Sequence, residues 1–88
     1  MRGIEVVTSE GPAGPAYVQF SRNSVARTEP TEIDDEVIVD YDADGSIVGI
    51  ELVSISNETI SALLEVARRN ELDLSALLSR SFAAPSAA

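Results

Sequence analysis

Five residues between positions 40 and 51 have the types and the spacing of a calcium-binding loop. They are Asp40, Asp42, Asp44, Gly45 and Glu51, and they match the pattern D-x-[DN]-x-[DN]-G-x5-E at every specified position. In such a loop the carboxylates supply the hard oxygen ligands that Ca²⁺ prefers, and the glycine permits the sharp turn between them. The residue types therefore allow a cation site formed by Asp40, Asp42 and Asp44.

The residues on either side of this acidic stretch predict a β-hairpin, whereas a calcium loop requires a helix after its glutamate. Two runs rich in β-branched residues, Val37–Val39 and Ile47–Ile50, flank the turn. Asp42 suits the first position of a type I turn, and Gly45 suits the left-handed position of a three-residue hairpin loop. Glu51 then lies roughly 20 Å along the second strand, too far to close a site at the tip. We therefore expect a structural turn, with cation binding at its tip as an alternative.

This turn also predicts which residues of the hairpin share a face. It places Asp42 opposite Ser46 and continues without interruption, so that Ile38 lies opposite Ile50. One face then carries the apolar residues Ile38, Val48, Ile50 and Leu52. The other face carries Val37, Val39, Tyr41, Ile47 and Val53, together with Gly49 and Glu51. Since both faces are apolar, we expect a helix to cover one of them and a second subunit to cover the other.

The segments before the hairpin predict the rest of a small antiparallel sheet. Ile4–Thr8 and Ala16–Ser21 have strand character, and the second alternates apolar residues on one face with polar residues on the other. Arg22–Ser24 is expected to make a tight turn into a further strand at Val25–Thr28. Pro30 ends that strand or confines it to a sheet edge, because proline cannot donate a ladder hydrogen bond.

After Ser56 the apolar residues recur with the period of a helix. A first helix is predicted over residues 58–70 and a second over residues 73–82, capped by Asp73. The fold class is α+β: a small antiparallel sheet of four or five strands with a central hairpin, followed by a C-terminal two-helix hairpin. We expect residues 1–82 to form one domain, with the sheet at 4–56 and the helices at 57–82, and residues 83–88 to form a disordered tail. The predicted interaction surface consists of Val37, Val39, Tyr41, Ile47, Leu77 and Leu78.

The chain of 88 residues contains no cysteine and no histidine. This removes disulfides, thiolate metal sites and the usual general base, and it leaves carboxylates, hydroxyls, tyrosine and arginine for chemistry. Carboxylate pairs such as Asp34 and Asp35 have only their residue type to suggest catalysis. We therefore predict that the protein is not an enzyme, and we expect no catalytic residue and no cofactor. No apolar run has the length of a membrane span and no signal-peptide core follows Met1, so a cytoplasmic location is expected.

The formal net charge is -9, and no lysine or arginine occurs between Thr28 and Ala67. A surface of this sign repels phosphate backbones and anionic lipid, so nucleic acid and membranes are not the expected partners. The expected partners are cations or a basic protein. Glu51, which lies between apolar neighbours, is expected either to pair with Arg22 or Arg27 or to lie at the rim of a face with its carboxylate in water.

The C-terminal part of the chain suggests one alternative of a different class. Residues 53–80 have the strand-helix-helix order of ribbon-helix-helix DNA-binding dimers, which read the major groove with side chains of the strand. The strand region here offers Glu51, Ser54 and Ser56, with no lysine, arginine or glutamine. A helical hairpin that packs on the sheet or mediates dimerisation is therefore the favoured interpretation.

Two segments carry a family resemblance. They are Ala16–Ser21, with the sequence A-Y-V-Q-F-S, and Glu32–Leu52, which contains V-I-V-D-Y-D-A-D-G-S-I-V-G-I-E-L. Together they resemble a small bacterial domain-of-unknown-function family typified by the YuzE-like proteins. The resemblance implies a compact α+β domain and supplies no activity. The chain departs from the family pattern at Ser9–Pro15, where members carry acidic residues, and it continues beyond the short members after Asn57.

These observations favour a small acidic protein-interaction module. We expect it to form a homodimer through an apolar sheet or helix face. A more concrete version is an antitoxin-like protein whose acidic surface neutralises a basic partner. The alternatives are the binding of calcium or another cation at the Asp40–Asp44 turn and a ribbon-helix-helix type of DNA-binding regulator.

Overall fold

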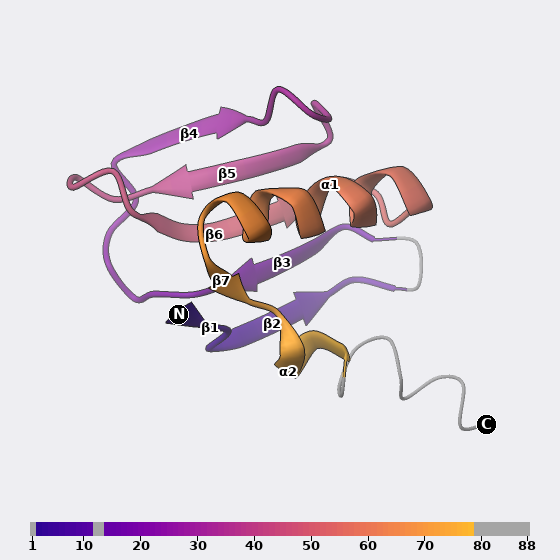
Figure 1. The fold of residues 1–88 in the computed structure, drawn as a ribbon, viewed down its shortest axis with the longest axis horizontal. Helices are drawn as coiled ribbons and strands as arrows, with labels where there is room; N and C mark the ends of the chain where they lie inside the picture. Colours follow the sequence, from indigo (N-terminus) through magenta and orange to yellow (C-terminus); the bar gives the residue numbers. More distant parts are fainter. Residues whose placement is uncertain (1, 12–13, 79–88) are drawn as a thin grey trace.

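The predicted hairpin forms the centre of one antiparallel sheet in the computed structural model, which describes residues 2–11 and 14–78. Its strands are β5 (Val37–Tyr41) and β6 (Ile47–Leu52), rich in β-branched residues that suit a pleated surface. The other strands of the sheet are β2 (Val6–Ser9), β3 (Ala16–Gln19) and β4 (Arg27–Pro30). Figure 1 shows the order β2-β3-β6-β5-β4, in which every neighbouring pair is antiparallel. The predicted sheet of four or five antiparallel strands is therefore confirmed.

The strand order is that of a Greek key. Strands β3 and β4 follow one another in the chain, yet β6 and β5 lie between them. The predicted tight turn at residues 22–24 is therefore wrong, because the connection over residues 20–26 has to pass two intervening strands. This connection is held against the hairpin by hydrogen bonds from the Ala26 N–H to the Tyr41 carbonyl and from the Asn23 amide to the Asp42 carboxylate. Pro30 ends β4 at the sheet edge, where its missing donor costs nothing.

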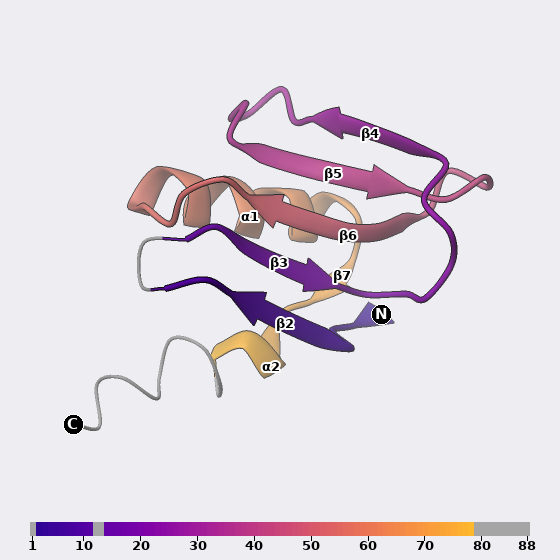
Figure 2. The same cartoon turned by 180° about the vertical axis from the view of Figure 1, so that it is seen from behind.

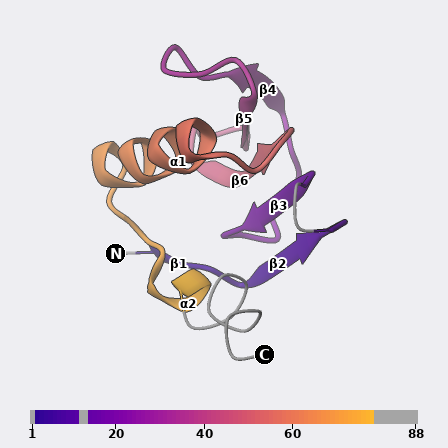
Figure 3. The same cartoon turned by 90° about the vertical axis from the view of Figure 1, so that its right-hand side faces the viewer.

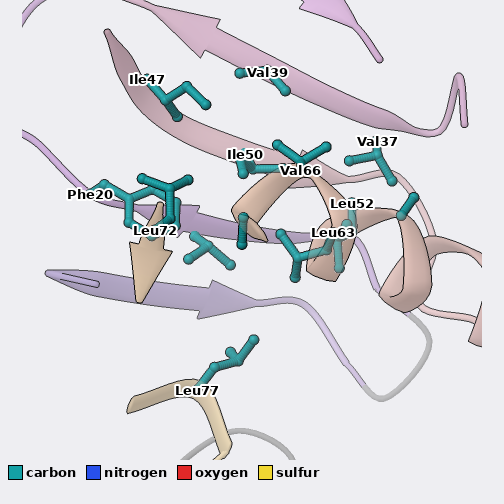
Figure 4. Close-up of a cluster of buried hydrophobic side chains, with 13 residues drawn as sticks. Phe20, Val37, Val39, Ile47, Ile50, Leu52, Leu63, Val66, Leu72 and Leu77 are labelled. Atoms are coloured by element: carbon teal, nitrogen blue, oxygen red, sulfur yellow. The ribbon is translucent and has the colours of Figure 1, made fainter. Parts of the chain in front are cut away.

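One helix, α1 (Asn57–Arg69), covers one face of the sheet (Figures 1 and 3). It begins at a capping box in which the Ser56 hydroxyl accepts the Thr59 N–H and the Thr59 hydroxyl accepts the Ser56 N–H. The buried residues that it contributes are Thr59, Ala62, Leu63, Val66 and Ala67. Figure 4 shows the resulting core, which is aliphatic except for the ring of Phe20.

A bulge in β6 corrects the predicted register of the hairpin. Tyr41 lies opposite Ile47 as predicted, but Asp40 lies opposite Gly49, so Val48 has no partner residue on β5. From that point every pair is shifted by one residue, and a shift of one moves side chains to the opposite face. Ile50 and Leu52 consequently join the same face as Val37, Val39, Tyr41 and Ile47. The prediction of two apolar faces is therefore wrong: most apolar residues of the hairpin gather on the face under α1, and Ile38 remains on the other.

The C-terminal segment also differs from the predicted two-helix hairpin. After α1 the chain turns at Glu71, with a φ of 55°, into the short strand β7 (Leu72–Asp73), which pairs in parallel with β1 (Arg2–Gly3). Only one turn of helix follows, α2 (Ser75–Leu78), and the Asp73 carboxylate accepts the Ser75 N–H as the predicted cap. The rest of the predicted second helix and the predicted tail lie outside the described residues. Within residues 2–11 and 14–78, no helix is long and apolar enough to cross a membrane.

Candidate interaction surface

The face of the sheet opposite α1 is not covered by any of the described elements, as Figures 2 and 3 show. We call it the open face. The strand registers place on it Val6, Thr8, Tyr17, Gln19, Thr28, Pro30, Ile38, Asp40, Gly49 and Glu51. Alternation along each strand separates these residues from the core residues between them, so the open face is mainly polar.

A hydrogen-bond network crosses the middle of the open face. The Tyr17 hydroxyl donates to Oδ2 of Asp40 at 2.8 Å, and the Thr28 hydroxyl donates to Oδ1 of Asp40 at 2.6 Å. The network links β3, β5 and β4, and it passes over β6 at Gly49. A Cβ atom at Gly49 would collide with the ring and hydroxyl of Tyr17, so the absent side chain is what lets the phenol reach Asp40. Burial, the bond to Asp40 and the charges of Asp40 and Glu51 raise the pKa of Tyr17 well above its ordinary value.

Glu51 lies beside this network on the central strand. Its neighbours on the adjacent strands are Tyr17 of β3 and Ile38 of β5, and its side chain is half-buried. The predicted ion pair with Arg22 or Arg27 does not form, since Arg22 pairs with Glu5 and Arg27 with Glu29. Among the residues that the structure describes, none makes a hydrogen bond or an ion pair with the Glu51 carboxylate.

A small pocket opens next to Glu51, at the end of the open face where β2 leads into β3. Its volume is about 130 Å³. It is lined by Thr8, Ser9, Glu10, Pro15, Ala16, Tyr17 and Glu51. Ligand pockets for whole cofactors or nucleotides have volumes of roughly 300–1,000 Å³, so this pocket fits a single side chain at most. We call it the Glu51 pocket.

The acidic turn that matched the calcium pattern is explained by turn chemistry. Oδ1 of Asp42 accepts the N–H groups of Asp44 and Ser46, and Oδ2 accepts the Asn23 amide, all at 2.9 Å. These bonds lower the pKa of Asp42, the bond from Asn23 contributing most. Asp40 is engaged by Tyr17 and Thr28, so two of the three candidate ligands already have protein donors. Within the described part of the chain, no group of three or more carboxylates is arranged to hold a metal ion.

The residues of the predicted interaction surface lie mostly in the core of the chain itself. The exposed fraction is 0% for Val37, 1% for Val39, 3% for Ile47 and 4% for Leu77, and all four belong to the hydrophobic core. These four side chains therefore do not form a surface of this chain. Tyr41 is half-buried, and the guanidinium of Arg27 lies 4.3 Å from the centre of its ring. The side chain of Leu78 lies outside what the structure describes.

The geometry of a ribbon-helix-helix dimer is absent from the described residues. Such a dimer forms when a strand from each subunit pairs with the other. The strand that precedes α1 is β6, and both of its edges are already paired, with β3 and with β5. Between α1 and α2 the chain forms the strand β7, which is not part of the motif. The alternative of DNA binding through such a strand is therefore not supported by the fold.

The sequence offered only partial signals for the open face. Alternation in Ala16–Ser21 correctly placed Tyr17 and Gln19 opposite the core, and Glu51 stood out between apolar neighbours. Gly49, inside a β-branched run, was the one sign of a close approach over the sheet. The partners Asp40 and Thr28 could not be found in this way, because they meet Tyr17 only through the order of the strands.

Comparison with known proteins finds that one segment of the chain is similar to a described family. Residues 16–56 match the model of a family described as "Protein of unknown function (DUF2283)". The match runs from β3 to the cap of α1, covers slightly less than half of the chain, and includes Tyr17, Asp40, Gly49 and Glu51. No curated protein and no solved structure matches the chain.

Proposed function

We propose that the protein is an interaction module that binds a basic protein through the open face. The observation that carries this proposal is a sheet with one complete core and one face that no described element covers, on which both charged residues, Asp40 and Glu51, are acidic. Antiparallel sheets commonly leave one face to solvent, so exposure alone is ordinary. An uncovered face of a single sign of charge, by contrast, selects partners of the opposite sign.

The charges favour a basic partner over a second copy of this chain. With a net charge of -9, two copies repel one another, and docking two open faces would bring four carboxylates together. Most of the apolar hairpin residues that suggested a homodimer are buried in the core of the chain itself. The main argument for self-association, an exposed apolar face of the hairpin, is therefore lost. The acidic charge of the open face still favours a basic protein.

The chemistry of the open face supports binding better than catalysis. The face offers carboxylates, hydroxyls and a phenol whose pKa is raised, which makes the phenol a poorer nucleophile near neutral pH. The chain has no cysteine or histidine to supply a stronger nucleophile or a general base. An antitoxin-like protein that covers a basic toxin is one concrete form of the proposal. It predicts that a small basic protein is encoded beside this gene, and that the two proteins copurify.

The proposal is tested with two matched substitutions on opposite sides of the molecule. Ile38→Arg places a positive charge on the open face, and Leu64→Arg places one on the outer side of α1, where Leu64 is 51% exposed. Each variant and the native protein are immobilised, partners are captured from a lysate of the native host, and the bound proteins are identified by mass spectrometry. We expect a basic protein that is captured by the native chain and by Leu64→Arg, is lost with Ile38→Arg, and is released by raised salt.

Three results would contradict the proposal. The first is equal capture by both variants, the second is a captured partner that is acidic, and the third is a specific partner that Leu64→Arg alone loses. Light scattering of the native protein serves as a companion measurement. A stable dimer that Ile38→Arg leaves intact would move the interface to another surface.

A further inference from the structure

We infer that the Glu51 pocket receives one arginine side chain of the basic partner. This inference rests on the proposed function and adds the residue that anchors the partner. The pocket lies on the open face, its lining includes Tyr17 and the two acidic residues Glu10 and Glu51, and its volume of about 130 Å³ fits one side chain. Hot spots of protein interfaces are often single arginine or aromatic side chains placed in such pockets.

The charges around the Glu51 pocket lack a cation. Among the described residues, Arg2, Arg22, Arg27, Arg68 and Arg69 all make hydrogen bonds or ion pairs elsewhere. Neither Glu51 nor Glu10 forms an ion pair within that part of the chain. Glu51 is half-buried and has already lost part of its hydration, so a cation that enters the pocket would pair with a carboxylate that needs less further desolvation than an exposed one.

The residues that line the pocket favour a guanidinium over an ammonium group. A guanidinium is planar, stacks on aromatic rings and donates to a carboxylate with two parallel bonds. The protein already shows this combination at Arg27, which lies 4.3 Å from the centre of the Tyr41 ring and 2.9 Å from Glu29. Tyr17 and Glu51 are cross-strand neighbours, so they offer an incoming arginine the same ring and carboxylate in one place.

Other occupants fit less well. A nucleotide or a phosphate would meet two carboxylates and a pocket that is too small. A bound metal ion would need more ligands than the pocket presents, since no described group of three or more carboxylates is arranged for one.

The test uses N-acetyl-arginine amide as the probe and N-acetyl-citrulline amide, its uncharged analogue, as the control. Amide chemical shifts of the full-length protein are followed by NMR during each titration. We expect the arginine probe to shift the amides of Thr8, Tyr17 and Glu51, and the citrulline analogue to leave them unchanged. In Glu51→Gln the affinity should fall about threefold to fivefold, as befits a partly exposed ion pair, whereas the control Glu58→Gln on α1 should bind like the native protein.

Three outcomes would overturn the inference. They are shifts spread over all acidic residues, equal affinity of Glu51→Gln, and equal or tighter binding of N-acetyl-lysine amide. Melting temperatures of both variants show whether either change acts through stability. The capture experiment separates this inference from the proposed function: a partner lost with Ile38→Arg but kept by Glu51→Gln supports the open face and contradicts the arginine anchor.

Discussion

The two faces of the sheet use the same strands in opposite ways. The face under α1 holds aliphatic side chains, most of them less than 5% exposed, from every strand except β4. The open face holds mainly polar groups, and hydrogen bonds join the Tyr17 phenol and the Thr28 hydroxyl to the Asp40 carboxylate. Burying a Val, Leu or Ile side chain contributes about 1.5–3 kcal/mol, whereas an intramolecular hydrogen bond contributes about 1 kcal/mol net. The covered face therefore supplies the stability, and the open face is free to be used for recognition.

The bulge at Val48 produces this division. Without it, Ile50 and Leu52 would lie on the open face and would leave a large apolar patch exposed to water. With it, Val37, Val39, Ile47, Ile50 and Leu52 share the face under α1, and Gly49 and Glu51 face outward. One additional residue in one strand thus separates a core from a binding surface.

The largest effect is expected from a substitution on the covered face. Leu63 is 0% exposed and Leu64, the next residue of α1, is 51% exposed. Leu63→Ala should lower the free energy of unfolding by about 2–5 kcal/mol, because it removes buried methyl groups and leaves a cavity. Urea denaturation measures the change.

Leu64→Ala is the matched control and should change the free energy of unfolding by less than about 0.5 kcal/mol. Similar losses from the two substitutions would mean that the outer side of α1 is also buried, in an assembly that the single chain does not show.

An intermediate effect is expected at Gly49, where the open face is most tightly constrained. In Gly49→Ala the new Cβ must displace Tyr17, so the bond to Asp40 breaks, and the free energy of unfolding should fall by about 1–3 kcal/mol. In a Tyr17→Ala background the same substitution should cost much less, because the obstructing ring is gone. A double-mutant cycle measured by urea denaturation gives both values. An equal cost in the two backgrounds would show that the phenol does not lie over Gly49.

The smallest effect is expected from Tyr17→Phe, which removes only the hydroxyl, and it should depend on pH. At neutral pH the loss should be about 1 kcal/mol, the usual value of one hydrogen bond. The pKa of Tyr17 is higher in the folded chain than its ordinary value of 10.0, so the phenol stabilises the fold fully below that pH. Its contribution disappears as the pH rises through the folded pKa.

The difference in unfolding free energy between the native protein and Tyr17→Phe should therefore shrink between about pH 7 and about pH 11. Urea denaturation at the two pH values measures it, and absorbance of the phenolate reports the titration of Tyr17 directly. A difference that grows with pH would contradict the hydrogen bond to the Asp40 carboxylate.

Local signals in the sequence predicted the elements well. The β-branched runs and the Asp42 to Gly45 turn predicted the hairpin, and the structure shows the hydrogen bond from the Gly45 N–H to the Asp42 carbonyl and a φ of 83° at Gly45. The change of period after Ser56 predicted the start of α1. These features depend on residues within a few positions of one another, which is why propensity and turn chemistry suffice.

Features that depend on distant contacts were predicted poorly. The bulge at Val48 leaves no mark in the pattern, since β-branched residues suit either face of a strand. The hydrogen bonds of the Val48 carbonyl with the N–H groups of Phe20 and Ser21 tie it to the end of β3, and this neighbour is known only once the strands are ordered. The pairing of Leu72–Asp73 with Arg2–Gly3 likewise joins the two ends of the described chain.

By itself, the sequence determined that this protein has an antiparallel sheet with a central acidic hairpin, a capped helix after it, and a strongly negative charge with no histidine or cysteine. Only the tertiary structure decided which face of the sheet is buried, that Asp42 is engaged by turn and loop donors, and that Tyr17, Asp40 and Glu51 meet on one open surface. The physical reason is that strand order and register arise from the packing of all the apolar residues at once. A one-residue shift costs little locally and exchanges the two faces of a strand.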